Sequence, residues 1–123
     1  MKTAATIKGD NYIINGSKHF ITNAPDADIF ILLATQDHKL RSKAVDAIIV
    51  EKGVKGMKVE PVHGKMGIRA SSVGEVTFEE CLVRVENRVG EDRNGFKETM
   101  EMLNLSRISV SYTHLTLPTI YSV

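Results

Sequence analysis

The stretch Asn15–Asp28, with the sequence NGSKHFITNAPDAD, decides the fold class because it combines turn signals with a strand pattern. The apolar run Tyr12–Ile14 precedes it, and Asn15-Gly16 is a dipeptide typical of tight hairpin turns. The next residues, His19–Thr22, alternate as a half-buried strand does. Asn23–Asp26 contains Pro25, which cannot donate to a neighbouring strand, so the strand ends there. We therefore expect a strand, a turn and a second strand.

The same kind of pattern covers most of the chain, as short apolar or alternating runs separated by turn signals. These runs predict strands at Lys2–Lys8, Asn11–Ile14, Ser17–Thr22, Asp28–Thr35, Val45–Glu51, Met57–Val62, Gly74–Phe78 and Leu82–Val85. The charged segment Gln36–Lys43 is expected to be a solvent-exposed loop. Together they predict a mainly β fold, a small barrel or sandwich of about seven strands.

A different pattern begins near the C-terminus. Gly95–Ile108, with the sequence GFKETMEMLNLSRI, carries apolar residues near helical spacing, and Asn94 can cap the helix. It looks like the truncated start of another domain. The last residues, Ser111–Val123, fit neither pattern, and Pro118 is hostile to a helix interior. We interpret this segment as a non-native tail.

Composition argues against several classes of function. The net charge is +1 and basic residues are interleaved with acidic ones, so no nucleic-acid surface is expected. Cys81 is the one cysteine, which fits a reducing compartment, and four scattered histidines show no metal-ligand spacing. No apolar run is long enough to cross a membrane, and the N-terminus shows no signal peptide. These features favour the cytoplasm, or the mitochondrial matrix in a eukaryote.

Two stretches carry a family resemblance. GSKHFITN, residues Gly16–Asn23, resembles the flavin-lining segment of the acyl-CoA dehydrogenase family. KMGIRASSVGEVTFEECLVRVENRVGE, residues Lys65–Glu91, resembles the middle domain of the same family, in the right order. The resemblance covers about Met1–Val110. It implies a middle β-barrel domain over residues 1–92, the start of a C-terminal helical domain over 93–110, and a tail outside the family over 111–123.

The resemblance implies FAD as the cofactor, bound by Phe20, Ile21 and Thr22. An aromatic ring at Phe20 can supply the flat wall that a flavin needs, and Thr22 can supply a hydrogen-bond donor. Their spacing of two places them on the same face of a regular strand. The family usually carries tryptophan here, so Phe20 keeps the stacking surface and loses the indole N–H. A core phenylalanine beside a surface threonine is the alternative interpretation.

The resemblance also implies a substrate-binding segment in the predicted helix, formed by Asn104, Leu105, Ser106 and Arg107. This sequence, NLSR, is similar to the (Asp/Asn)-x-x-Arg that contacts acyl-CoA in the family. Asn104 and Arg107 share a helix face, although an Asn–Arg pair on a solvated helix has the same spacing. A minority of the family places its catalytic glutamate where this chain has Ser106, so we assign no catalytic residue here. The base is expected downstream in the parent enzyme.

The loop that contains Arg69, Ser71 and Ser72 has two interpretations. It can meet a phosphate or the pantetheine arm of coenzyme A, or its serine hydroxyls can hold the loop's own backbone. The second is favoured, so these residues stay outside the predicted site.

The implied reaction is α,β-dehydrogenation of an acyl-CoA thioester, with an electron-transfer flavoprotein as acceptor and a homotetramer or dimer as the intact enzyme. A related acyl-CoA oxidase, a flavin monooxygenase of the same fold, and a non-catalytic β-barrel binding module remain alternatives. We expect the present chain alone to be inactive.

Overall fold

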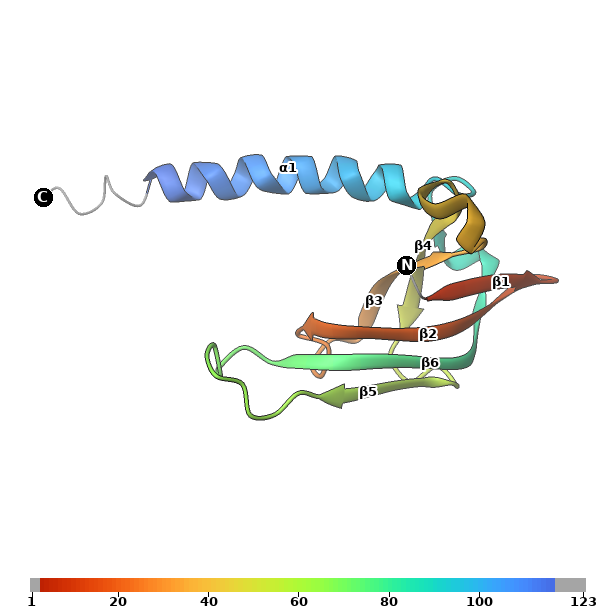
Figure 1. Ribbon diagram of the computed structural model, residues 1–123, viewed down its shortest axis with the longest axis horizontal. Coiled ribbons are helices and arrows are strands. Elements are labelled where there is room, and N and C mark those ends of the chain that lie inside the picture. Colours follow the sequence, from red (N-terminus) through yellow and green to blue (C-terminus); the bar gives the residue numbers. More distant parts are fainter. Residues whose placement is uncertain (1–2, 117–123) are drawn as a thin grey trace, which may run out of the picture.

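The computed structural model describes residues 3–116 and is mainly β (Figure 1). In chain order its elements are β1 (Ala4–Lys8), β2 (Asn11–Thr22), β3 (Ile29–Thr35), the 3-10 helix η1 (His38–Ala44), β4 (Val45–Glu51), β5 (Met57–Pro61), β6 (Val73–Arg84), the 3-10 helix η2 (Val85–Asn87), β7 (Arg88–Val89) and α1 (Gly95–Thr116). The predicted mainly β fold, with seven strands in one sheet and a single C-terminal helix, is confirmed.

The sheet is bent, so that β3 and β4 cross β2 and β6 at a steep angle (Figure 1). Its strand order is β5-β6-β2-β1-β3-β4-β7, and β1–β3 is its one parallel contact. The core lies between the two halves of the sheet. It includes Tyr12 and Ile14 from β2, Ile48 from β4, and Val76 and Phe78 from β6. Burial of this shared apolar face is the main force that holds the sheet together.

The sheet does not close into the expected barrel. The strand β1 has five residues and pairs with Asn11–Asn15 of β2, while it meets β3 at the single pair Ala4↔Thr35. Within the described residues no strand therefore lies between Gly16–Thr22 and the facing edge of β3. An apolar groove of about 220 Å³ occupies this position, lined in part by Lys18 and Phe30.

The turn expected at Asn15-Gly16 is wrong, because β2 runs through it as one strand of 12 residues. The register with β6 shifts between Ile14 and Gly16, which marks a β-bulge. Gly16 adopts a φ of 133°, and a side-chain carbon there would lie 2.8 Å from the Cα atom of Thr3. The Asn15 side chain accepts the Glu80 N–H at 2.8 Å. These contacts favour a bulge over a turn, and the bulge keeps the buried side chains of β2 and of β6 on the same face of the sheet.

The strand β6 differs from the sequence prediction in the same way. It joins the predicted strands Gly74–Phe78 and Leu82–Val85 into one element of 12 residues. Glu79 and Glu80 lie between the paired residues Phe78 and Cys81, and the alternation of buried residues changes phase there. The predicted loop Gln36–Lys43 contains all of η1 except its last residue, and the first turn of η1 is capped by the Asp37 carboxylate.

The helix α1 is longer than predicted. It begins at Gly95 as expected and continues past Ile108 to Thr116, so the first part of the segment interpreted as a tail is helical. Residues 117–123 lie outside the described residues. The helix starts against β4 and then extends away from the sheet (Figure 1). Within residues 3–116 no helix is long and apolar enough to cross a membrane.

Candidate functional site

The predicted flavin wall lies at the end of β2, on an irregular part of the strand. The register with β6 passes from Lys18↔Val76 to Ile21↔Gly74, so His19 and Phe20 together oppose the single residue Glu75. This bulge gives Phe20 a φ of 56° and leaves its side chain 78% exposed. Thr22, which pairs with Val73, is exposed as well. Both side chains are therefore accessible to a ligand.

Ile21 points the other way from its two neighbours. It is partly buried, packs against the core cluster and lines the apolar groove together with Lys18 and Phe30. Burial in this groove lowers the pKa of the Lys18 ammonium from its ordinary value. Ile21, which lies between the exposed residues Phe20 and Thr22, anchors the strand in the core and thereby fixes the backbone at the predicted site.

The loop before β6 is held by polar groups of its own and of the turn after β2. The Ser72 carbonyl accepts the Asn23 N–H at 2.9 Å, and the Ser72 hydroxyl donates to the Asp26 carboxylate. The Lys65 ammonium donates to two carbonyls of the same loop, and Arg69 Nε donates to the Lys65 carbonyl at 3.0 Å. The backbone of the loop is thus held by Lys65 and Arg69, whereas the Ser72 hydroxyl bonds to the turn after β2 and not to the loop's own backbone as expected.

The predicted substrate segment lies on α1, and the side chains of Asn104–Arg107 are all exposed. The Ser106 hydroxyl donates to the Met102 carbonyl at 2.9 Å, one turn back on the same helix. Arg107 borders a shallow hollow of about 400 Å³ together with Tyr112. Among the described residues no hydrogen bond or ion pair joins this segment to Phe20–Thr22. Each segment is accessible, but the structure does not bring the two into contact.

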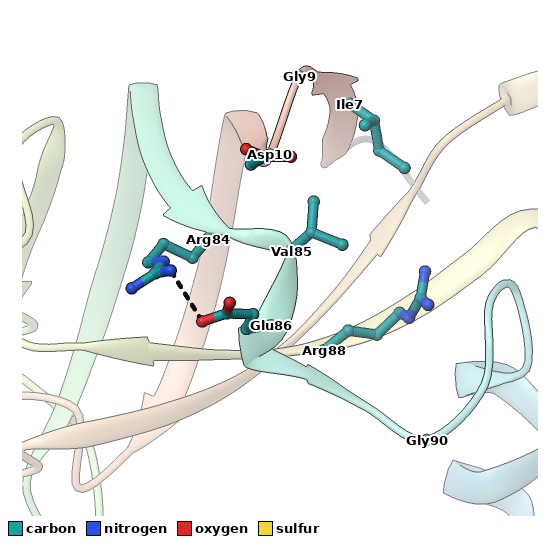
Figure 2. A pocket seen from close by; sticks show the side chains of 8 residues that line it. All are labelled: Ile7, Gly9, Asp10, Arg84, Val85, Glu86, Arg88 and Gly90. Carbon is teal, nitrogen blue, oxygen red and sulfur yellow. Dashed lines mark ion pairs between the residues drawn. The ribbon is translucent and has the colours of Figure 1, made fainter.

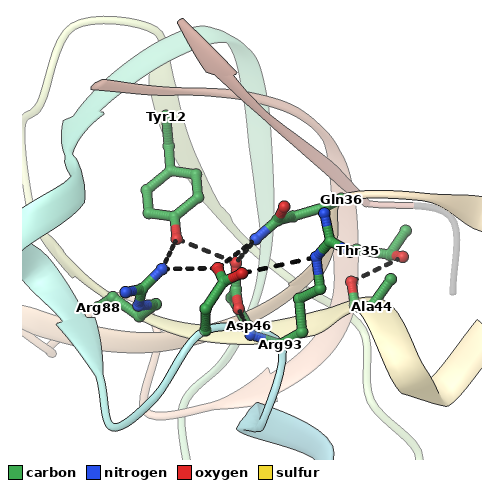
Figure 3. A network of polar contacts seen from close by, with 8 residues as sticks. Tyr12, Thr35, Gln36, Ala44, Asp46, Arg88 and Arg93 are labelled. Atoms are coloured by element: carbon green, nitrogen blue, oxygen red, sulfur yellow. Dashed lines mark hydrogen bonds and ion pairs between the residues drawn. The ribbon is translucent and has the colours of Figure 1, made fainter. Parts of the chain in front are cut away.

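A buried polar network lies where α1 begins, and the sequence prediction missed it (Figure 3). Asp46 on β4 is fully buried, and its carboxylate accepts from Tyr12, Gln36 and the backbone N–H of Arg93. Burial raises the pKa of Tyr12, so the phenol stays protonated and donates. The signal that could have identified this network is the one carboxylate in the otherwise apolar run VDAIIV, residues 45–50.

A polar cleft of about 500 Å³ lies beside that network, under the turn between β1 and β2 (Figure 2). Its lining includes two arginines, Arg84 and Arg88, and two acidic residues, Asp10 and Glu86. Arg84 and Glu86 form an exposed ion pair at 3.0 Å. Because the charges of the lining balance, the cleft favours neither an anion nor a cation, and we assign it no ligand.

Comparison with known proteins identifies the family of the chain. A family model described as "Acyl-CoA dehydrogenase, middle domain" matches residues 1–81 of the chain. The chain belongs to the acyl-CoA dehydrogenase family. A short-chain specific acyl-CoA dehydrogenase of Clostridium acetobutylicum is 44% identical over 110 residues. That alignment covers 89% of this chain and 29% of the relative, so the chain spans less than a third of that enzyme's length.

Solved structures of the acyl-CoA dehydrogenase family share the fold. Butyryl-CoA dehydrogenase from Megasphaera elsdenii superposes with a TM-score of 0.81 at 40% identity, covering 89% of this chain and 29% of that one. A chain from a structural study of the electron transferring flavoprotein of Acidaminococcus fermentans superposes with a TM-score of 0.79 at 42% identity. It covers 84% of this chain and 27% of that chain.

Proposed function

We propose that the full-length protein containing this chain is an FAD-dependent acyl-CoA dehydrogenase, which oxidises the α,β carbon–carbon bond of an acyl-CoA thioester. In this proposal residues 1–92 form its middle domain, residues 93–110 begin its helical domain, and residues 111–123 lie outside the family pattern. Family membership supports the reaction class. The observation that supports the site is the accessible pair Phe20 and Thr22 at the end of β2.

The residues at the end of β2 fit a flavin. A phenylalanine that is 78% exposed leaves a large flat apolar surface in water, and a ring system stacked on it would bury that surface. Thr22, exposed two residues further along the strand, offers a hydroxyl and a backbone N–H, while Ile21 anchors the strand in the core. When bound, FAD would supply the acceptor for the hydride leaving the substrate β-carbon. The role of Phe20–Thr22 is to hold and orient the ring.

The helix α1 supplies the substrate contacts in this proposal. Arg107 presents an exposed guanidinium, and Asn104 lies one turn earlier on the same face, so the two can bind phosphate or carbonyl oxygens of acyl-CoA. Ser106 donates its proton to the Met102 carbonyl and is a poor acceptor for a substrate proton. We therefore place the base that removes the α-proton on another part of the full-length enzyme.

The remaining parts of the proposal come from the family. Electrons would pass to an electron-transfer flavoprotein, the enzyme would be a homotetramer or dimer, and it would work in the cytoplasm or the mitochondrial matrix. An acyl-CoA oxidase is the nearest other reaction, and it differs in passing electrons to oxygen. Assays with and without oxygen would separate the two.

The substrate role of α1 can be tested by kinetics on the full-length enzyme. Loss of a charge-assisted hydrogen bond costs roughly 1.5–3 kcal/mol, so Arg107→Ala should lower kcat/KM about 10- to 100-fold, mainly through KM. Arg107→Lys should recover part of the loss. Lys97→Ala, an exposed cation earlier on the same helix, is the matched control and should leave the kinetics unchanged. Wild-type kinetics for Arg107→Ala would contradict the assignment.

A further inference from the structure

The junction between the sheet and α1 is built around one carboxylate. Asp46 Oδ2 accepts from the Tyr12 hydroxyl at 2.9 Å and from Gln36 Nε2 at 2.5 Å, while Oδ1 accepts the Arg93 N–H at 2.7 Å. The three donors come from β2, from the segment after β3 and from the segment before α1 (Figure 3). Asp46 therefore ties both halves of the sheet to the start of the helix.

A second set of bonds surrounds this carboxylate. Arg88 Nη1 donates to Asp92 Oδ1 at 2.7 Å and to the Tyr12 hydroxyl at 3.4 Å. Gln36 Nε2 donates to the same Asp92 oxygen at 3.0 Å. The Gln36 amide thus faces two acidic oxygens at once. Its orientation is fixed, since a flip would place its own oxygen against Asp92.

The backbone entering α1 is pressed against β4 at this point. Arg93, whose N–H is held by Asp46, has a φ of 59°, a conformation that costs free energy for a residue other than glycine. Asn94 forms a parallel bridge with Val45. Gly95 is buried, and a Cβ atom there would lie 2.4 Å from the Ala47 nitrogen. The first residue of the helix therefore contacts the strand backbone directly.

We propose that Asp46 is a positioning residue that fixes the direction in which α1 leaves the sheet. The helix has 22 residues, and the side chains of residues 104–112 are exposed, so its direction is set at one end. Arg107 is twelve residues from Gly95, or about 18 Å along the axis, and a tilt of about 10° at the start moves it by about 3 Å. Only the proposed function requires Arg107 to lie at a set distance from Phe20–Thr22, so that part of the inference rests on it. The control of helix direction by Asp46 does not rest on the proposed function.

The direct test measures the helix direction in the present chain. Nitroxide labels at Lys55→Cys and Glu101→Cys, both in exposed positions and in a Cys81→Ala background, report the distance between the sheet and the helix. Asp46→Asn keeps the shape of the side chain but turns one of its two acceptor oxygens into a donor, so either Tyr12 and Gln36 or the Arg93 N–H loses its acceptor. We expect its distance distribution to be at least about twofold broader than that of the wild type. A second label pair at Lys8→Cys and Lys55→Cys, within the sheet, should stay unchanged.

Two further variants separate positioning from stability. Tyr12→Phe removes one donor and keeps the buried ring, so it should fold and give an intermediate broadening. Thr3→Val removes a buried hydroxyl that donates to the Ser17 carbonyl at 3.3 Å, far in the sequence from α1, and should change stability without changing the helix distances. A wild-type distribution in folded Asp46→Asn and Tyr12→Phe would overturn the proposal, as would equal broadening in Thr3→Val. The test uses neither flavin nor substrate, so its failure leaves the proposed function untouched.

Discussion

Asp46 is the one fully buried acidic side chain among residues 3–116, and without it the Tyr12 hydroxyl and the Arg93 N–H would lose their acceptor, whereas Gln36 would keep its bond to Asp92. Removal of a buried acceptor leaves its partners desolvated, which costs about 1–3 kcal/mol for each group. Asp46→Ala should therefore lower the free energy of unfolding by about 3 kcal/mol or more, and Tyr12→Phe by about 1 kcal/mol. Urea denaturation of the two variants measures this. Equal losses would contradict a network centred on the carboxylate.

Lys18 gives a prediction of the pH dependence of stability. Burial lowers its pKa in the fold, so between that value and the ordinary lysine pKa of about 10.4 the unfolded chain binds more protons at this site. Stability then rises with pH across this window, and the cost of burying the ammonium is fully present below it. Lys18→Met should be more stable than the wild type near neutral pH, and the advantage should shrink toward about pH 10. Tyr12 titrates in both proteins, so the difference between their free energies of unfolding isolates the contribution of Lys18. A difference that stays constant with pH would contradict this prediction.

At the scale of elements, the β-bulges determine which face of the sheet each side chain of β2 lies on. Gly16 and Gly9 both have positive φ values, but a Cβ atom at Gly16 would lie 2.8 Å from the Thr3 backbone, whereas nothing lies within 4 Å at Gly9. Gly9→Ala should cost about 1 kcal/mol through backbone strain alone, and Gly16→Ala about 2 kcal/mol or more. Thermal unfolding of the two variants tests this. Equal costs would argue for a hairpin turn at Asn15-Gly16.

The helix α1 should be stable only near its start. Asn94, just before the helix, bridges Val45 of β4, and Gly95 lies against the β4 backbone. The side chains of residues 104–112 are exposed, and an isolated helix gains little from propensity alone. Amide hydrogen exchange in the present chain should be slow in β2 and β6 and fast over residues 104–112. Slow exchange across that range would show that α1 has a partner this structure does not contain, such as a second copy of the chain.

The sequence predicts some elements well and others poorly, for physical reasons. The strands β3, β4 and β5 lie within one residue of prediction, because each is a single apolar or alternating run bounded by turn residues. Asn15-Gly16 suits a tight turn and a bulge equally, and the choice depends on the distant contact with Thr3. A motif predicts Phe20 and Thr22 as site residues, whereas Asp46 belongs to no motif. Its role depends on donors from Tyr12 and Arg93, which are far away in the sequence.

At the scale of the whole molecule, the open sheet limits what the present chain can bind. Ligand sites usually bury about 70–90% of a ligand, but Phe20 and Thr22 offer one exposed wall. We therefore expect the 123-residue chain to bind FAD weakly and to show no dehydrogenase activity. Gel filtration with added FAD, followed by absorbance of the protein peak, tests the first expectation. Stoichiometric flavin retained by the chain would contradict it.

The most direct test of the proposed function uses the full-length protein. Purified anaerobically, it should carry bound flavin whose visible absorbance is bleached by a saturated acyl-CoA thioester, since oxidation of the substrate reduces the cofactor. Phe20→Ala should lower the flavin content, and Arg107→Ala should raise the acyl-CoA concentration needed for bleaching. A full-length protein that binds no flavin, or whose flavin stays oxidised with a series of acyl-CoA chain lengths, would contradict the assignment of this chain to an acyl-CoA dehydrogenase.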